Sequence, residues 1–238
     1  MSSPVVMIHG YDYDPFDPNN SPFANDGAFT AWTKHLDGKK IVPLPWYSAR
    51  AVKDIFRAWM AGHLTTYSWA YLDLVEPAVD KLLNIKAPRL PDVICHSLGS
   101  RVILRALEER PNSFRRVIFL NGAETVKAAT PIIRNSPWTQ FLNISVSTDD
   151  VLKRLGAWFE PEFGKHALIG YRGIGASAGL ENLTEVQLDD KGTQQFYRRQ
   201  YGWDLRGDNP DSIGDHRFSY LHEGNWPLYR TFLRQGWV

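Results

Sequence analysis

The stretch PDVICHSLGSRVILRALEER, from Pro91 to Arg110, constrains the fold of this chain more than any other part of the sequence. Its first half is a short apolar run typical of a buried strand, and its second half has apolar residues at helical spacing. We predict a strand at Asp92–His96 and a helix at Leu98–Arg110 that stops before Pro111. A strand that passes so abruptly into a helix is typical of a parallel sheet covered by helices.

The rest of the chain alternates in the same way between short β-rich runs and amphipathic runs. Further strands are predicted at Val5–His9, Lys40–Trp46, Arg116–Leu120, Phe141–Ser147 and Leu183–Leu188. Helices are predicted at Ala28–Leu36, Ala51–Ala61, Ser68–Leu83 with a kink or restart at Pro77, and Phe218–Gln235 with an interruption near Pro227. With 238 residues and no composition break, we expect a single α/β domain over residues 1–238.

Composition excludes several classes of partner and location. The chain has 27 basic and 26 acidic residues, a net charge of +1, so it lacks the field that holds nucleic acid. One cysteine cannot form an internal disulfide, which fits a reducing compartment. The N-terminal MSSPVVMIHGY does not resemble a signal peptide, and no stretch approaches the ~18 apolar residues of a membrane span. We therefore expect a cytoplasmic protein without a transmembrane segment, and leave its oligomeric state open.

Polar residues with possible chemistry follow the predicted strands. In a parallel sheet such residues gather beyond the carboxyl ends of the strands, where loops converge and helices begin. The groups at these ends are His9-Gly10-Tyr11, Ser97, Asn121-Gly122-Ala123-Glu124, Thr148-Asp149-Asp150 and, after a long connection, His216. Their positions predict one site at the carboxyl edge of the sheet.

The turn at Ser97 and the order Ser, acid, His resemble the α/β-hydrolase superfamily, and more closely its serine esterases and lipases. The resemblance runs from Val5 to Trp237 and lacks the first strands of the full family sheet. It implies a three-layer α/β-hydrolase fold with a mostly parallel central sheet and helices on both faces. The family's turn usually reads G-x-S-x-G, and here Cys95 takes the place of the first glycine. We interpret Cys95 as a small buried residue that the turn tolerates.

The resemblance implies a catalytic triad and an oxyanion hole. Ser97 would be the nucleophile and His216 the base, with Asp149 as the acid and Asp150 or Glu124 as alternatives. The oxyanion would be held by two backbone N–H groups, those of Leu98 and Tyr11.

Aromatic residues near the predicted site suggest an apolar pocket. The candidates for its lining are His96, Trp46, Tyr47, Trp138 and Trp203, and lid or pocket elements are expected near 48–70 and 189–215.

These residues together predict a serine hydrolase that forms a covalent acyl-enzyme on a small-molecule ester. A thioesterase, amidase or lactonase with the same triad is the alternative reaction, and a non-catalytic ligand-binding member of the fold is the alternative from another class. No cofactor is expected. His216 and His222 lack zinc-site spacing, the acidic run Asp12–Asp17 lacks the remaining ligands of a calcium loop, and the glycines of 173–178 lack the helix that a dinucleotide site needs.

Overall fold

The structure is a computed structural model that describes residues 3–10, 28–36, 38–46, 69–159, 168–208 and 216–237. Its centre is a six-stranded sheet in the order β2-β1-β3-β4-β5-β6, and every neighbouring pair of strands is parallel. The strands are β1 (Val5–Ile8), β2 (Ile41–Leu44), β3 (Asp92–His96), β4 (Arg116–Leu120), β5 (Gln140–Ser145) and β6 (Leu183–Gln187). The parallel sheet expected from the sequence is confirmed, and all six strands overlap their predicted ranges.

Alternate residues of the inner strands supply two separate hydrophobic layers. In β1, Val6 and Ile8 belong to one buried cluster, whereas Val5 and Met7 belong to the other. Successive side chains of a strand point to opposite faces, so a strand covered by helices on both faces must be apolar throughout. Pro43 lies in β2, an edge strand, where a residue without an N–H is tolerated.

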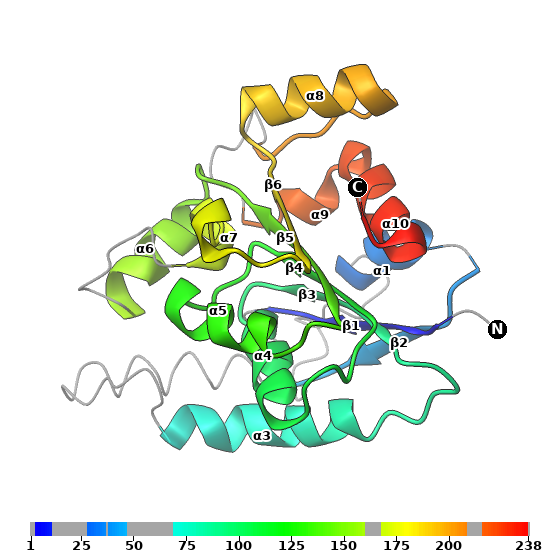
Figure 1. Ribbon diagram of the computed structural model, residues 1–238, viewed down its shortest axis with the longest axis vertical. Helices are drawn as coiled ribbons and strands as arrows, with labels where there is room; N and C mark the ends of the chain where they lie inside the picture. The colour runs from blue at the N-terminus through cyan, green and yellow to red at the C-terminus, as the bar shows by residue number, and fades with distance from the viewer. Residues whose placement is uncertain are drawn as a thin grey trace.

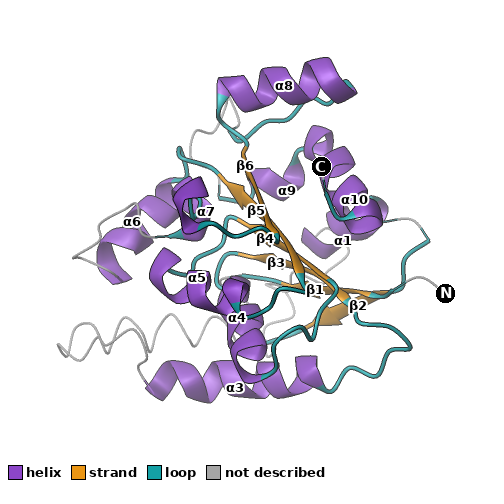
Figure 2. Ribbon diagram, in the orientation of Figure 1, coloured by secondary structure: helices purple, strands orange, loops and turns teal. Residues whose placement is uncertain are grey.

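Helices cover both faces of this sheet, which makes the architecture three-layered (Figure 1). One layer consists of α3 (Trp69–Leu83), α4 (Gly99–Glu109), α5 (Val126–Arg134), α6 (Asp150–Phe159) and α7 (Ile169–Arg172). The opposite layer consists of α1 (Ala28–Lys34), α9 (Phe218–Leu221) and α10 (Trp226–Gln235), as Figure 2 shows by the helices on the other side of the strands. With its six parallel strands and two helical layers, the described part of the chain has the three-layer α/β architecture that the sequence predicts.

Several helices differ from the sequence-based prediction. The segment 189–215 was expected as a loop or lid, but α8 (Lys191–Tyr201) lies within it, capped by Asp190 at its start and by left-handed Gly202 at its end. Helices α5, α6 and α7 were also missed. Pro77 lies inside α3, which does not restart there. The predicted helix 51–61 and nearly all of the expected lid 48–70 lie outside the described residues.

The end of the chain is interrupted as expected, but the proline has a different role. A 3-10 turn, η4 (Glu223–Asn225), separates α9 from α10, and Pro227 lies in the first turn of α10. Proline is well suited to that position because its missing N–H would have no intrahelical acceptor there. In the part of the chain that the structure describes, no helix is both long and apolar enough to cross a membrane.

Candidate active site

Ser97 occupies a strained turn between β3 and α4. Its backbone has φ 53, in the left-handed region that a residue with a side chain adopts at a cost of about 1–3 kcal/mol. The turn is held by hydrogen bonds at both ends of the residue: Ser97 N donates to the Leu120 carbonyl over 3.0 Å, and the Ser97 carbonyl accepts from the N–H groups of Ser100 and Ala123, each at 3.0 Å. The Ser100 hydroxyl also donates to the Ser97 carbonyl, at 2.7 Å. The surrounding structure therefore imposes the conformation that this turn needs.

Two glycines allow the chain to pass close to this turn. A Cβ on Gly10 would lie 2.6 Å from Cβ of Ser97, so the loop after β1 packs directly against the serine. A Cβ on Gly99 would lie 2.7 Å from the His9 carbonyl oxygen and 2.9 Å from that of Ile8. Both distances are too short for a side chain, so glycine is needed at each position. The sequence HG after β1 thus places the backbone of that loop beside Ser97.

Cys95, at the place of the family's first glycine, lies in the core. Its side chain is fully buried, and its Sγ lies 3.5 Å from the Ile118 carbonyl. Burial raises the pKa of the Cys95 thiol well above its ordinary value, which disfavours the reactive thiolate. The packing role expected for Cys95 fits this position.

His216 is bound to Asp149 at the carboxyl edge of the sheet. The Nδ1 of His216 lies 2.6 Å from Oδ2 of Asp149, and both residues are buried. A carboxylate can only accept here, so Nδ1 carries a proton, and in the neutral imidazole Nε2 keeps its lone pair. A histidine in this tautomer can act as a base through Nε2.

Asp149 is held by three donors. Besides His216, the Asn121 amide donates to Oδ2 over 2.7 Å, and the Leu152 N–H donates to Oδ1 over 3.0 Å. Burial alone would raise the pKa of Asp149, but the charge and hydrogen bond of His216, together with the Leu152 and Asn121 donors, lower it below its ordinary value. Asp149 is therefore an ionised carboxylate that also caps the first turn of α6.

The other two candidate acids make different contacts. The Asp150 side chain is 51% exposed and pairs with Lys153, in the exposed first turn of α6. Glu124 accepts from the Thr125 N–H at 2.7 Å and lies 3.9 Å from the Arg101 guanidinium. Of the three carboxylates left open by the sequence, Asp149 is the one bonded to the His216 imidazole.

Asn121 is a site residue whose role the sequence reasoning did not identify. It follows β4 directly, with its backbone in the left-handed region at φ 48, and its amide donates to Asp149. Asparagine tolerates this conformation better than most residues. The sequence contained one signal for this role. Asn121 directly follows a buried strand, as Ser97 does on the neighbouring strand.

Three buried polar atoms of this site have no hydrogen-bond partner among the described residues: the Ser97 hydroxyl, Nε2 of His216 and the amide oxygen of Asn121. The first two are groups that can transfer a proton. Ser97 and His216 belong to neighbouring parts of the structure, because the His216 ring lies 4.5 Å from the ring of His96, the residue that precedes Ser97. A buried polar atom without a partner costs free energy, so a pair of them beside a strained turn points to a group that reacts or binds rather than to packing.

His96 positions the segment that carries His216. Its Nε2 lies 3.0 Å from the His216 carbonyl, to which it must donate, and its ring packs edge-on against Tyr220. Burial, followed by the nearby His216, lowers the pKa of His96 well below its ordinary value. A neutral His96 thus ties the end of β3 to the segment before α9, and its place in the lining of a pocket stays a prediction.

His9 and Trp46 brace the loop after β1. The Trp46 N–H donates to His9 Nε2 over 3.4 Å, and the Trp46 indole donates to the His9 carbonyl over 3.0 Å. His9 Nδ1 donates to the Gly10 carbonyl over 2.9 Å. Burial lowers the pKa of His9 to about 4, so the ring stays neutral. Trp46 is buried in the core, where its indole stacks on the His9 ring.

The remaining predicted residues are distributed as follows. Leu98 begins α4, so its N–H lies in the first turn, where amides have no intrahelical acceptor. Tyr11 and Tyr47 lie outside the described residues. Trp203 stacks on Tyr197 and packs against the core beside α8. Trp138 is 82% exposed and precedes β5, at the amino end of the strand, so it lies at the wrong edge of the sheet for a pocket around Ser97.

The glycine-containing loop at 173–178 binds a side chain of the protein itself. Glu185 accepts hydrogen bonds from the N–H groups of Ile174, at 2.5 Å, and Gly175, at 2.7 Å. The loop is thus ordered around an internal carboxylate, and it ends in a 3-10 turn at Ala176–Ala178. Among the described residues, no group of three or more His, Cys, Asp or Glu side chains could hold a metal ion.

Comparison with known proteins adds a distant structural likeness. No family model and no curated protein matches the chain. Among solved structures it is similar to a predicted CIB-like hydrolase from Thermoplasma acidophilum, with 13% sequence identity, 83% of each chain covered and a TM-score of 0.38. That likeness is too distant to support a function, so the fold rests on the topology described above and the site rests on its own geometry.

Proposed function

We propose that the protein is a serine hydrolase that cleaves carboxylic esters through a covalent acyl-enzyme. The observation that carries the proposal is the combination at one sheet edge of a strained Ser97 and a His216 whose Nδ1 is bonded to Asp149. Within the described parts of the chain, neither the Ser97 hydroxyl nor Nε2 of His216 has a hydrogen-bond partner. A serine hydroxyl is a weak nucleophile, and this arrangement supplies the base and the orienting carboxylate that activate it.

The chemistry follows from the roles of these atoms. Ser97 Oγ attacks the substrate carbonyl while His216 Nε2 takes its proton, and the proton then goes to the leaving alcohol. Water reverses the sequence and releases the acid. Ser97 and His216 are not hydrogen-bonded to each other in this structure, and such contacts often tighten only when substrate is bound. Asp149 keeps the imidazole in the required tautomer.

The oxyanion would be held by backbone donors at the turn. The Leu98 N–H lies at the start of α4, where the helix dipole favours negative charge. The second donor in the proposal is the Tyr11 N–H. The close approach of Gly10 to Ser97 supports a contribution from that loop. Each such donor is worth about 10²–10³ in turnover.

The test is hydrolysis of a panel of p-nitrophenyl esters of graded chain length, together with thioesters, amides and lactones. The wild-type protein should hydrolyse esters fastest, and Ser97→Ala should lose about 10⁴-fold or more in kcat. Cys95→Ala is the matched control at the same turn, and it should retain activity within about 3-fold. Faster hydrolysis of thioesters, amides or lactones than of esters would make that class the substrate. Activity of Ser97→Ala equal to that of the wild type would refute the serine mechanism.

A further inference from the structure

A second concave site lies at the amino edge of the sheet, opposite the edge that carries Ser97. It is a pocket of about 360 Å³, a volume in the range of small-molecule sites. Residues before four adjacent strands contribute to it: Ser3 before β1, Lys39 before β2, Arg89 before β3 and Arg115 before β4. Helix α10 closes it with Arg230 and Arg234.

The lining of this pocket is strongly basic. Lys39, Arg89, Arg115, Arg230 and Arg234 give it five cations, and none of its lining residues is acidic. The whole chain has a net charge of only +1, so this concentration of positive charge is local. Like charges gathered in a concave surface repel each other, and they raise the local concentration of anions.

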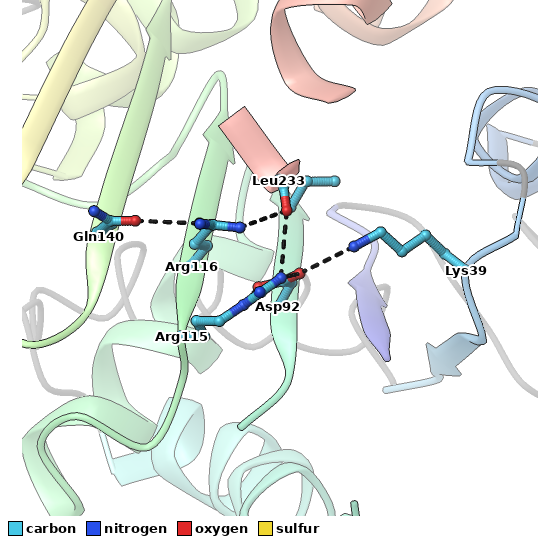
Figure 3. A network of polar contacts seen from close by, with 6 residues as sticks. All are labelled: Lys39, Asp92, Arg115, Arg116, Gln140 and Leu233. Carbon is cyan, nitrogen blue, oxygen red and sulfur yellow. Dashed lines mark hydrogen bonds and ion pairs between the residues drawn. The ribbon is translucent and has the colours of Figure 1, made fainter. Parts of the chain in front are cut away.

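Part of this charge has a structural task, as Figure 3 shows. The buried Asp92 carboxylate is bound by Arg115, whose Nε lies 2.8 Å from Oδ1, and it lies 3.6 Å from the Lys39 ammonium. The Leu233 carbonyl, in the last turn of α10, accepts from Arg116 at 2.6 Å and from Arg115 at 3.3 Å. This network fixes the end of α10 against the starts of β3 and β4.

The other three arginines have no such task. Arg89, Arg230 and Arg234 are exposed, and within the described residues none of them has an ion pair. Arg230 and Arg234 are four residues apart on α10, so they share one face, and like charges at that spacing destabilise a helix. Ser3 adds to the same lining a buried hydroxyl that has no hydrogen-bond partner in the described part of the structure. These groups are donors for an anion and are not used by the fold.

We propose that this pocket binds a small anion that carries two or more linked phosphate groups. A guanidinium group can bind a phosphate through two parallel hydrogen bonds. The guanidinium groups of this pocket come both from the segments before the strands and from α10, which favours a ligand with more than one anionic group. The Asp92 charge does not oppose binding, because Arg115 and Lys39 already neutralise it. The proposal is independent of the hydrolase activity, since the pocket lies at the opposite edge.

Calorimetric titration of the full chain with inorganic tripolyphosphate, at constant ionic strength, tests the proposal. Saturable binding at a 1:1 ratio is expected, with a Kd below about 1 mM. Orthophosphate and citrate should bind at least about 10-fold more weakly. Ser97→Ala should bind tripolyphosphate as the wild type does, which separates this pocket from the other edge.

The double variant Arg230→Gln/Arg234→Gln should weaken binding by about 10-fold or more. It should unfold at the same or a higher temperature without ligand, since it removes a repulsive pair from exposed positions. Arg154→Gln/Arg199→Gln removes the same charge from exposed arginines outside the pocket and should change the Kd by less than about 2-fold.

Three results would overturn the proposal. The first is no saturable binding of tripolyphosphate by a folded wild-type protein. The second is equal weakening by the two double variants, which would mean attraction by net charge alone. The third is tighter binding of citrate, or of a single-stranded oligonucleotide with affinity that grows with its length, because either would assign the surface to a different class of ligand.

Discussion

Two buried carboxylates lie at opposite edges of the same sheet, and they are used differently. Asp92 and Asp149 are both almost inaccessible to solvent. Arg115 binds Asp92 and also donates to the Leu233 carbonyl, which accepts a second hydrogen bond from Arg116, so that network joins secondary-structure elements. Asp149 instead orients His216, and neither the other nitrogen of that ring nor the Ser97 hydroxyl at the same sheet edge has a hydrogen-bond partner among the described residues.

The difference teaches that burial and a charged partner do not by themselves mark a functional site. Both edges have short, charge-assisted hydrogen bonds. The carboxyl edge adds strained backbone at Ser97 and Asn121, which the fold does not need. We therefore expect variants at the carboxyl edge to lose activity and variants of the Asp92 network to lose stability.

The largest effect is expected for Asp149→Asn. The amide cannot accept the His216 Nδ1 proton as a carboxylate does, so the imidazole loses its required tautomer and kcat should fall about 10⁴-fold. Ester hydrolysis by purified variants measures the change. Asp150→Asn and Glu124→Gln are matched controls and should stay within about 2-fold of the wild type. A larger loss in either control than in Asp149→Asn would transfer the role of the acid to that residue.

Variants of the Asp92 network, at the amino edge, should change the stability of the protein and not its activity. Arg115→Ala leaves Asp92 buried with only the Lys39 ammonium at 3.6 Å. We expect the free energy of unfolding to fall by about 3 kcal/mol, measured by urea denaturation. The kcat per folded molecule should remain within about 2-fold. A large fall in kcat with an unchanged free energy of unfolding would contradict the assignment of stability to the amino edge and activity to the carboxyl edge.

The buried histidines at the carboxyl edge should make stability sensitive to acid. The pKa of His9 is lowered from 6.5 to about 4, so the unfolded chain takes up its proton first as the pH falls. The stabilising contribution is complete above pH 6.5 and is lost as the pH falls toward about 4. The free energy of unfolding should fall by at most about 3 kcal/mol through His9.

Denaturation of the wild type and of His9→Gln across this pH range isolates the effect of His9. Glutamine can still donate to the Gly10 carbonyl and accept from the Trp46 N–H. The gap in unfolding free energy between the two proteins should narrow as the pH falls, whereas His96 contributes equally to both. Parallel curves would show that His9 is not kept neutral by the fold.

The smallest effect is expected for Asn121→Gly. Glycine accepts the left-handed backbone at this position, so the variant removes the amide donor to Asp149 without adding strain. We expect kcat to fall about 10-fold with little change in KM, since one hydrogen bond to a charged group is lost. Steady-state kinetics of the purified variant measure both constants. An altered KM at constant kcat would mean that Asn121 contacts the substrate.

The sequence was sufficient for the sheet and for the residues at its carboxyl edge. Buried parallel strands are continuous apolar runs, and the residues that follow them converge whatever their distance along the chain. Ser97 and His216 could therefore be proposed before their contacts were known, with the help of the family resemblance, whereas the acid stayed open among Asp149, Asp150 and Glu124. Helix α8 was missed because it is largely polar, although Asp190 and Gly202 are ordinary capping signals.

Other features depend on contacts between distant segments and could not be read from local patterns. Trp138 seemed a candidate for the pocket, but the short turn before β5 places it at the amino edge. The donor role of Asn121 toward Asp149 depends on the pairing of β4 with β5. The basic pocket combines residues from four strand starts and from α10, which are separated widely in sequence.

Covalent labelling of Ser97 tests the central claim most directly. A fluorophosphonate reacts with a serine that is activated by a neighbouring base, and peptide mass spectrometry locates the adduct. We predict one adduct, on Ser97, that forms in the folded wild type, is much slower in Asp149→Asn and is unaffected by Arg115→Ala. Absence of an adduct on Ser97 in folded protein, or an adduct on another residue that accounts for the activity, would contradict the account.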